Sequence, residues 1–473
     1  MPTSRFVFLT FIFVLLLAFC TANATIINIP DDYYWIQVGI DSAASGDTIL
    51  VQPGTYRETL VFHGTGITLA SLYLLDPNSE YIESTIIDAA RQQRAMDFRQ
   101  SGDSASVVCG FTIRNGGTSY GGGVYCAFSS PTLRDLVIEN CQTYRMGGGV
   151  YCTQESRPMF INVKLSGNVS PVGGGIGIAH SAHPTLINCE ITGNTADSTG
   201  GGVFIGHEFA AITTDGVLIA DNNARFGGGL YITDSPDIIL KNVTICNNKS
   251  ENGNGMYLTH DFQTCNVELI NSIVYFNQFP AVVITGDTID NGTILTISYS
   301  DIEDRLEGII VEDNGHVIWS QGSIYRDPDF RNLEDEDYYL TAGSPCFDSG
   351  DPESREDPDG SRADMGAFFF DRRINDVRSE NEFFTPNRFG LLAVYPNPFN
   401  SAATLRYELS VSCSISLYLV NPIGQNVLTL FDGFHQSGIH QMEINAENMA
   451  SGSYVLRMTD KDQTSERKLI LMD

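Results

Sequence analysis

The chain has 473 residues, of which 42% are hydrophobic and 10% aromatic, so it is long enough for two or three folded domains and too apolar for broad disorder. It carries 57 acidic against 27 basic residues, a formal net charge of −30. Nucleic acids and anionic membrane surfaces attract clustered lysine and arginine, so this charge argues against both as partners.

The N-terminus predicts export from the cytoplasm. Arg5 precedes an apolar run over residues 6–20, and the small-residue stretch TANA at 21–24 follows it. This pattern predicts a signal peptide, residues 1–24, cleaved after Ala24. The apolar run is too short for a membrane span and no later stretch is long enough, so we expect no span in the mature chain. Nine cysteines remain without zinc-binding spacing, and we expect most of them to be buried apolar side chains.

The segment after the signal peptide predicts a cap for the structure that follows. Asp31 or Asp32 is expected to cap a short helix that carries Trp35, Ile36 and Ile40, and Gly46 is expected to end it. Strands are predicted at residues 48–51 and 67–69.

The middle of the chain is a repeat. A triple-glycine motif recurs, with one degenerate copy at the end. Its copies start at Gly121, Gly147, Gly173, Gly200, Gly227 and Gly253. The intervals of 26, 26, 27, 27 and 26 residues indicate a solenoid. No strand–GxxxxGK–helix context surrounds the glycines, so a phosphate-binding loop is excluded. We interpret them as corners where a positive φ or a close backbone approach leaves no room for a side chain.

Each copy alternates with a period of two residues. In the first copy, Val124 and Cys126 are predicted to face a core and Tyr125 the outside. A second strand follows in each copy, and the asparagines after it, expected to turn the chain and to stack in a ladder, are Asn140, Asn168, Asn194, Asn222, Asn247 and Asn277. No helical period is visible. The repeat therefore predicts an all-β solenoid, with coils of ~26 residues forming a parallel β-helix.

The segments STIIDAA and GFTIRNG, together with the triple-glycine coils, resemble exported bacterial right-handed parallel β-helix proteins, whose fold is shared with pectate lyases. The glycine–asparagine coils also resemble the repeats of polymorphic outer-membrane proteins. The acidic stretch over 327–368, with DPDF, DYYLTAGSPCFDSGDP and DPDGSRADMGAF, resembles the closing segment of the same β-helix family. The resemblance implies one right-handed β-helix over residues 25–370, including the N-terminal cap and this closing segment.

The C-terminal part has a different pattern. Residues 371–390 have no period and are predicted to be a linker, and 391–473 contain short alternating strands typical of a small β-sandwich. YPNP at 395–398, Gly424-Gln425, Gly438, SGSY at 451–454 and KLIL at 468–471 resemble the C-terminal sorting domain of the type IX secretion system. The resemblance implies that 391–473 engages the type IX secretion machinery. It also implies a protein released outside a Gram-negative bacterium or displayed on its outer-membrane surface.

The outward position of the repeat is the first candidate site. Its aromatic residues, predicted to point away from the core and to bind sugar rings, are Tyr125, Tyr151, Phe204, Tyr231 and Tyr257, with a gap at Gly177. The alternative is that these rings pack under loops of the same sheet.

Titratable residues recur seven positions after each triplet. The catalytic candidates at and beside this position are His180, His207, Glu208, Asp234, His260 and Asp261. Neighbouring imidazoles and carboxylates suit acid–base catalysis or cation binding, and a solvated polar turn is the alternative. In the acidic closing segment, Asp357, Asp359 and Asp364 are candidate calcium ligands, because oxygen-rich loops suit Ca²⁺; a plain solvated loop is the alternative.

The hypothesis that the sequence favours is a secreted or surface protein that binds an extracellular polysaccharide or cell-surface glycan, or mediates adhesion, without catalysis. A polysaccharide lyase or a glycoside hydrolase is the first alternative, and a structural surface component the second. The catalytic sets of pectate lyases and polygalacturonases find no match among the coils, which disfavours the enzyme.

Overall fold

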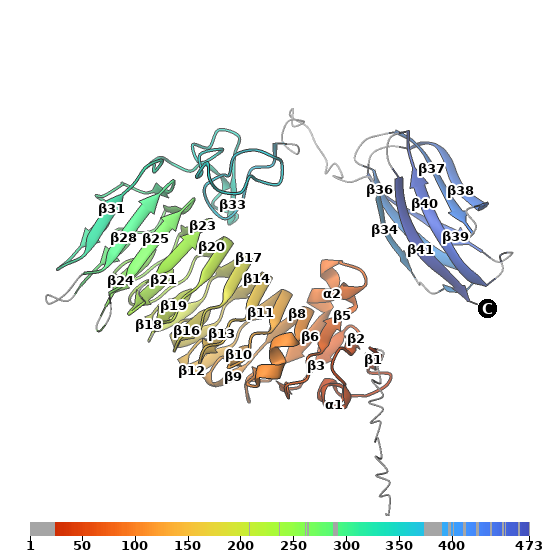
Figure 1. Cartoon of the computed structure of the whole chain (residues 1–473), viewed down its shortest axis with the longest axis horizontal. Helices are drawn as coiled ribbons and strands as arrows, with labels where there is room; N and C mark the ends of the chain where they lie inside the picture. The colour runs from red at the N-terminus through yellow and green to blue at the C-terminus, as the bar shows by residue number, and fades with distance from the viewer. Residues whose placement is uncertain are drawn as a thin grey trace, which may run out of the picture. The chain divides into compact units, whose positions relative to one another are not determined.

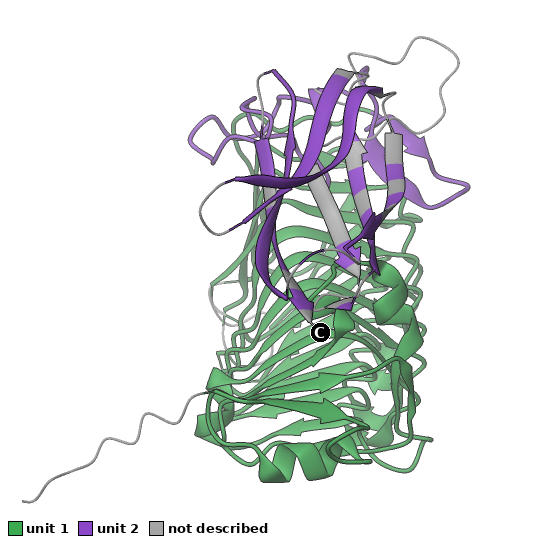
Figure 2. Ribbon diagram, turned by 90° about the vertical axis from the view of Figure 1, so that its right-hand side faces the viewer, with its two compact units in different colours: residues 1–326 green, residues 327–473 purple. Residues whose placement is uncertain are grey.

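The computed structural model describes residues 24–372 except 208, 236, 261, 263 and 287–291, and 390–472 except 396–398, 401, 410–412, 422–424, 436–437, 447–448, 450 and 462–463. The chain divides into two compact units, residues 1–326 and 327–473, coloured separately in Figure 2.

The first unit is a right-handed parallel β-helix of about 11 turns, as the sequence predicts. Its strands stack as successive rungs in Figure 1. The largest of its three sheets has 17 strands: β1 Ile26–Ile29, β2 Thr48–Val51, β3 Gly54–Tyr56, β5 Thr68–Ser71, β6 Thr85–Asp88, β8 Val107–Arg114, β11 Thr132–Glu139, β14 Met159–Ser166, β17 Thr185–Thr192, β20 Thr213–Ala220, β22 Ile238–Lys241, β23 Val243–Cys246, β25 Asn266–Ile270, β26 Ile273–Tyr275, β28 Ile294–Ser298, β29 Asp301–Ile302 and β31 His316–Trp319.

Two further sheets run along the solenoid, a ten-stranded one and a four-stranded one that spans fewer coils. The ten-stranded sheet holds the strands that follow the glycine triplets, and consists of β4 Leu60–Val61, β7 Met96–Phe98, β10 Val124–Ala127, β13 Val150–Thr153, β16 Ile176–Ala179, β19 Val203–Gly206, β21 Leu230–Thr233, β24 Met256–Thr259, β27 Val282–Ile284 and β30 Ile309–Val311. The four-stranded sheet consists of β9 Gly117–Tyr120, β12 Gln142–Met146, β15 Val169–Val172 and β18 Thr195–Thr199. Isolated parallel bridges carry it on through Asn223 and Lys249 in the next two coils.

The core lies inside the coils, where the predicted inward residues meet. Val124, Cys126 and their counterparts in the next coil, Val150 and Cys152, pair in register and are fully buried. Equivalent side chains therefore stack one above another, each coil burying the apolar face of its neighbour.

The glycine triplets turn the corner between the four-stranded and ten-stranded sheets, and both predicted reasons for them hold. The first glycine of each triplet has positive φ, as at Gly173 with φ of +63°. The third is crowded by the next coil, since a Cβ added at Gly175 would lie 2.7 Å from the carbonyl oxygen of Gly202. The first position therefore needs the left-handed backbone, and the third leaves no space for a methyl group.

The predicted asparagine ladder exists, with a corrected register. Its buried members are Asn168, Asn194, Asn222, Asn248 and Asn277, and each Oδ1 accepts the backbone amide of the residue one coil earlier at 2.9–3.0 Å. Asn140 and Asn247 were wrongly placed in the ladder. They lie one residue earlier, at a turn position with φ near +53° and +52°. Asparagine suits both adjacent positions, so the spacing alone did not separate the ladder from the turn.

The N-terminal cap contains the predicted helix, α1 Ile36–Ser42, but its capping residue is different. Glu58 rather than Asp31 or Asp32 accepts the amides of Ile36 and Gln37, both at 2.9 Å. Ile36 and Ile40 are buried against the first coils, which closes that end of the core. A second helix, α2 Ser79–Ser84, and two 3₁₀ turns, η1 Leu72–Leu74 and η2 Ser101–Ala105, lie between the following strands.

The second unit begins with the acidic segment, which holds the hairpin of β32 Phe330–Asn332 and β33 Asp337–Leu340. Two sheets follow, which are antiparallel except for the parallel pairing of Phe399 and Asn400 with Leu471 and Met472. Residues 373–389 of the predicted linker lie outside the described residues. One sheet contains β34 Gly390–Tyr395, β36 Ala402–Leu409 and β39 Gly438–Asn445. The other contains β35 Phe399–Asn400, β37 Cys413–Val420, β38 Asn426–His435, β40 Gly452–Thr459 and β41 Thr464–Met472. A shared apolar core that includes Leu405, Leu417 and Leu456 joins them.

Candidate functional site

The outward aromatic residues form a ladder along the ten-stranded sheet. Tyr125, Tyr151, Gly177, Phe204, Tyr231 and Tyr257 pair in register across six consecutive strands. The rings of Tyr231 and Tyr257 are stacked, with centroids 5.3 Å apart and an interplanar angle of 1°. Phe204 stacks on Tyr231 with centroids 5.7 Å apart. The spacing follows from the rise of one strand per coil.

The middle of the ladder is covered. Tyr151 is 5% exposed and Phe204 is 4% exposed, whereas Tyr125, Tyr231 and Tyr257 are only partly buried. Met146 occupies the gap at Gly177, where an added Cβ would lie 2.6 Å from its Cγ. Stacked rings turn their faces to one another, so the partly exposed members offer mainly edges and hydroxyl groups to a ligand. Packing therefore explains Tyr151 and Phe204, and a binding role for the other three stays a prediction.

The titratable row at the next corner divides into separate environments. His180 and His207 are exposed and their imidazoles stack with centroids 5.7 Å apart. Asp234 is buried and accepts the amide of Phe262 at 2.8 Å, and buried His260 pairs through Nδ1 with the hydroxyl of Thr293 at 3.0 Å. Glu208 and Asp261 lie outside the described residues. The structure thus brings two of the histidines together and gives Asp234 and His260 local structural contacts.

The acidic segment uses its candidate calcium ligands as hydrogen-bond acceptors. Asp364 accepts the amides of Asp348 at 2.6 Å and Phe370 at 2.7 Å, and Asp357 accepts the amide of Asp364 at 2.9 Å. Asp359 accepts the amide of Ser361 at 2.9 Å. Burial raises the pKa of the Asp364 carboxyl to about 7. Within the described ranges, no group of three or more His, Cys, Asp or Glu side chains could hold a metal ion.

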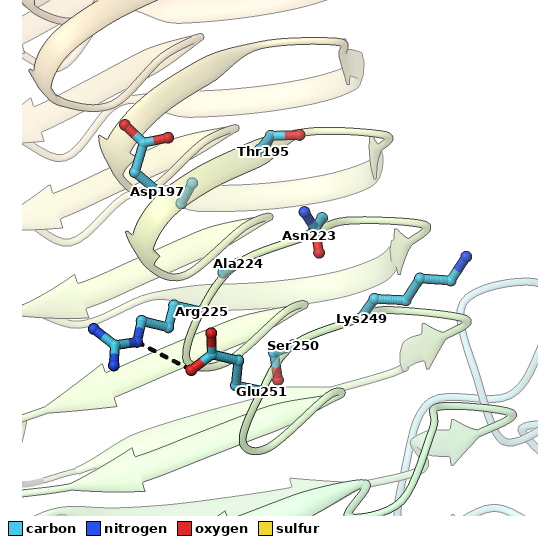
Figure 3. A pocket seen from close by; sticks show the side chains of 9 residues that line it. Thr195, Asp197, Asn223, Ala224, Arg225, Lys249, Ser250 and Glu251 are labelled. Carbon is cyan, nitrogen blue, oxygen red and sulfur yellow. Dashed lines mark hydrogen bonds and ion pairs between the residues drawn. The ribbon is translucent and has the colours of Figure 1, made fainter.

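A shallow hollow on the four-stranded face was missed by the sequence reasoning. It has a volume of 420 Å³ and crosses three coils, with one row of lining residues from each: Thr195, Ala196 and Asp197; Asn223, Ala224 and Arg225; Lys249, Ser250 and Glu251 (Figure 3). The central residue of each row is small, and this lowers the floor between two polar rims. Alignment of these positions across the repeats would have revealed the run of small residues.

The rims of this hollow carry balanced charge. Arg225 Nε pairs with Glu251 Oε2 on the next coil at 3.1 Å, as the dashed line in Figure 3 marks. Asp197 and Lys249 add one charge of each sign. The Arg225 guanidinium also lies 5.3 Å from the ring centroid of Phe226, whose ring meets that of Tyr257 edge-on at 5.5 Å. The hollow and the partly exposed end of the aromatic ladder are therefore linked at the same corner of the solenoid.

Two known families match this chain. Residues 148–324 match the right handed beta helix region family, and residues 393–472 match the secretion system C-terminal sorting domain family. No curated protein matches the chain. None of the helices in the described part is long and apolar enough to cross a membrane. The C-terminal domain indicates a secreted or cell-surface protein that uses the type IX secretion machinery.

Proposed function

We propose that this chain, a right-handed parallel β-helix protein exported by means of its C-terminal sorting domain, binds an extracellular or cell-surface glycan without altering it chemically, and acts in adhesion. The observation that carries the proposal is the three-coil hollow beside the Phe226–Tyr257 corner.

The chemistry of the hollow suits a chain of sugar units. Its rims present hydroxyl, amide, carboxylate and cationic groups, so both donors and acceptors are available to sugar hydroxyls. Both rims are polar in each of the three coils, ~4.8 Å apart, so a polymer lying along the solenoid axis would meet hydrogen-bonding or charged groups at each step. The exposed ring edges of Tyr231 and Tyr257 add apolar contact, and their hydroxyl groups add hydrogen-bonding groups.

The enzymatic alternative has less support. A lyase or glycoside hydrolase needs an acid and a base that converge on one bond. Asp234 and His260 are buried and hydrogen-bonded to neighbouring turns. Only the exposed pair His180 and His207 is left as a candidate among the described residues of that row. A purely structural surface component is the second alternative.

A screen that records binding and product release together separates the three hypotheses. The full chain is tested against neutral and acidic polysaccharides, with and without Ca²⁺. Ala224→Tyr should fill the hollow, and the double change Tyr231→Ala and Tyr257→Ala should remove the aromatic edges. Lys164→Ala is the matched control, because Lys164 is exposed on the 17-stranded sheet, where it pairs with Glu190.

Binding that both test variants lose and Lys164→Ala keeps, without released products, would support the proposal. Release of unsaturated or newly reducing ends would establish an enzyme instead, and His180→Ala and His207→Ala would be examined next. Neither binding nor products would favour the structural component.

A further inference from the structure

A second, smaller and more enclosed pocket lies at the N-terminal end of the aromatic ladder. It has a volume of 220 Å³ and contacts β4, β7 and β9 and the turn before β7; its lining residues are Thr59, Leu60, Val61, Gln93, Arg94, Asp97, Arg99 and Thr118. Asp97 pairs in register with Tyr125, so the pocket occupies the rung directly before the first tyrosine of the ladder.

The charges in this pocket do not balance. Arg99 Nε donates to Asp97 Oδ1 at 2.7 Å, and Arg94 Nη1 lies 3.4 Å from Asp97 Oδ2. Two guanidinium groups therefore share one carboxylate, which leaves one positive charge in excess. Arg94 Nη1 is buried and has no partner at hydrogen-bond geometry, and the Arg94 side chain as a whole is only 15% exposed. A buried cation that lacks a full counter-charge is costly, and a second anion would remove that cost.

Tyr125 gives the two arginines a common support. The Cζ atoms of Arg94 and Arg99 lie 4.2 Å and 5.0 Å from its ring centroid, within cation–π range. These contacts hold both guanidinium groups beside the pocket before a ligand arrives. Pre-positioned guanidinium groups recognise carboxylate and sulfate groups with paired, charge-assisted hydrogen bonds.

We propose that this pocket binds one anionic group, a carboxylate or a sulfate, carried by a glycan that extends along the solenoid. The inference rests on the proposed function, since it names the chemical class of the same ligand. The net charge of −30 repels polyanions in general, so affinity for an anionic glycan would have to come from this local excess of positive charge.

Three polymers with one backbone test the inference on the full chain: dextran, carboxymethyl-dextran and dextran sulfate. Affinities are measured by calorimetry for wild type, Arg94→Gln, Arg99→Gln and the control Lys164→Gln, an exposed cation on the 17-stranded sheet. Arg99, with 56% of its side chain exposed, should tolerate substitution, so this variant remains informative even where Arg94→Gln unfolds the coil. Circular dichroism reports folding of each variant.

We expect one of the anionic polymers to bind at least about tenfold more tightly than dextran, with that advantage lost in Arg99→Gln and kept in Lys164→Gln. The polymer that binds identifies the group as carboxylate or sulfate. Equal affinity for all three polymers, no binding of either anionic polymer, or an anionic preference that survives Arg99→Gln would overturn the inference. Binding of a neutral glycan that Ala224→Tyr abolishes would leave the proposed function intact in each of those cases.

Discussion

Replacing Asn222 by alanine should destabilise the β-helix by about 4–6 kcal/mol, because this side chain makes four buried hydrogen bonds. Its Oδ1 accepts the backbone amide of Asn194 at 2.9 Å and the Asn194 Nδ2 at 3.0 Å. Its Nδ2 donates to the carbonyl of Ile191 at 2.8 Å and to Asn248 Oδ1 at 3.0 Å. Alanine leaves the Asn194 amide without this acceptor, at a cost of roughly 1–3 kcal/mol, and each other lost bond costs about 1 kcal/mol.

The neighbouring residue supplies the control. Asn223 is exposed on the rim of the hollow, so Asn223→Ala should change the free energy of unfolding by no more than about 0.5 kcal/mol. Urea unfolding followed by far-ultraviolet circular dichroism measures both variants. If Asn222→Ala lies within about 1 kcal/mol of Asn223→Ala, the ladder does not stabilise the coils as argued.

Four further outcomes follow from the structure. Gly175→Ala should prevent normal folding, since its Cβ would meet a carbonyl oxygen at 2.7 Å, whereas Gly193→Ala, with open space and φ of +63°, should cost about 1–2 kcal/mol in urea unfolding. Among the residues that the structure describes, eight cysteines are buried and should resist a thiol reagent at pH 8 until the chain is unfolded. Burial raises the pKa of six of these thiols, to about 12 for Cys109. Labelling of the native protein at any of these eight positions, mapped by mass spectrometry, would contradict this. The carboxyl of Asp364 should titrate near pH 7 by carbon-13 NMR. In the unfolded chain the same carboxyl ionises near pH 3.8, so the stability of the folded segment should fall as the pH rises from about 3.8 to about 7. Asp364→Asn should remove that pH dependence. Deletion of residues 391–473 should stop export across the outer membrane, and truncated protein found in the medium would refute that role.

Much of the β-helix could be predicted because its causes are local and repeated. The triplet at Gly173 and the alternation of Val124, Tyr125 and Cys126 each recur at one interval, so a single interpretation applies to every coil. The cap of α1 could not be predicted in the same way. The capping carboxylate belongs to Glu58, 22 residues after the first helical amide, and no local sequence pattern predicts that contact.

The candidate site was predicted less well, because side-chain contacts between coils decide it. The register of the aromatic row was evident from the spacing, but the burial of Tyr151 and Phe204 was not. The hollow depends on small residues at equivalent positions such as Ala224, which stand out only when the repeats are aligned at these positions. The pocket at Arg94 depends on Asp97 being shared between two arginines, which the sequence places close together without showing which pairs form.

The separation of inward and outward positions has a consequence for how this surface can diverge. Asn223 lines the hollow and is exposed, while the apolar contacts of its coil are made by other residues, such as Ile219 and Leu230. A single change at one outward position alters one step of the surface and leaves the stacking of the coils untouched. Duplication or loss of a 26-residue coil would lengthen or shorten the hollow by one step. Paralogues could therefore acquire different ligand preferences, and hollows of different length, through changes that do not destabilise the core.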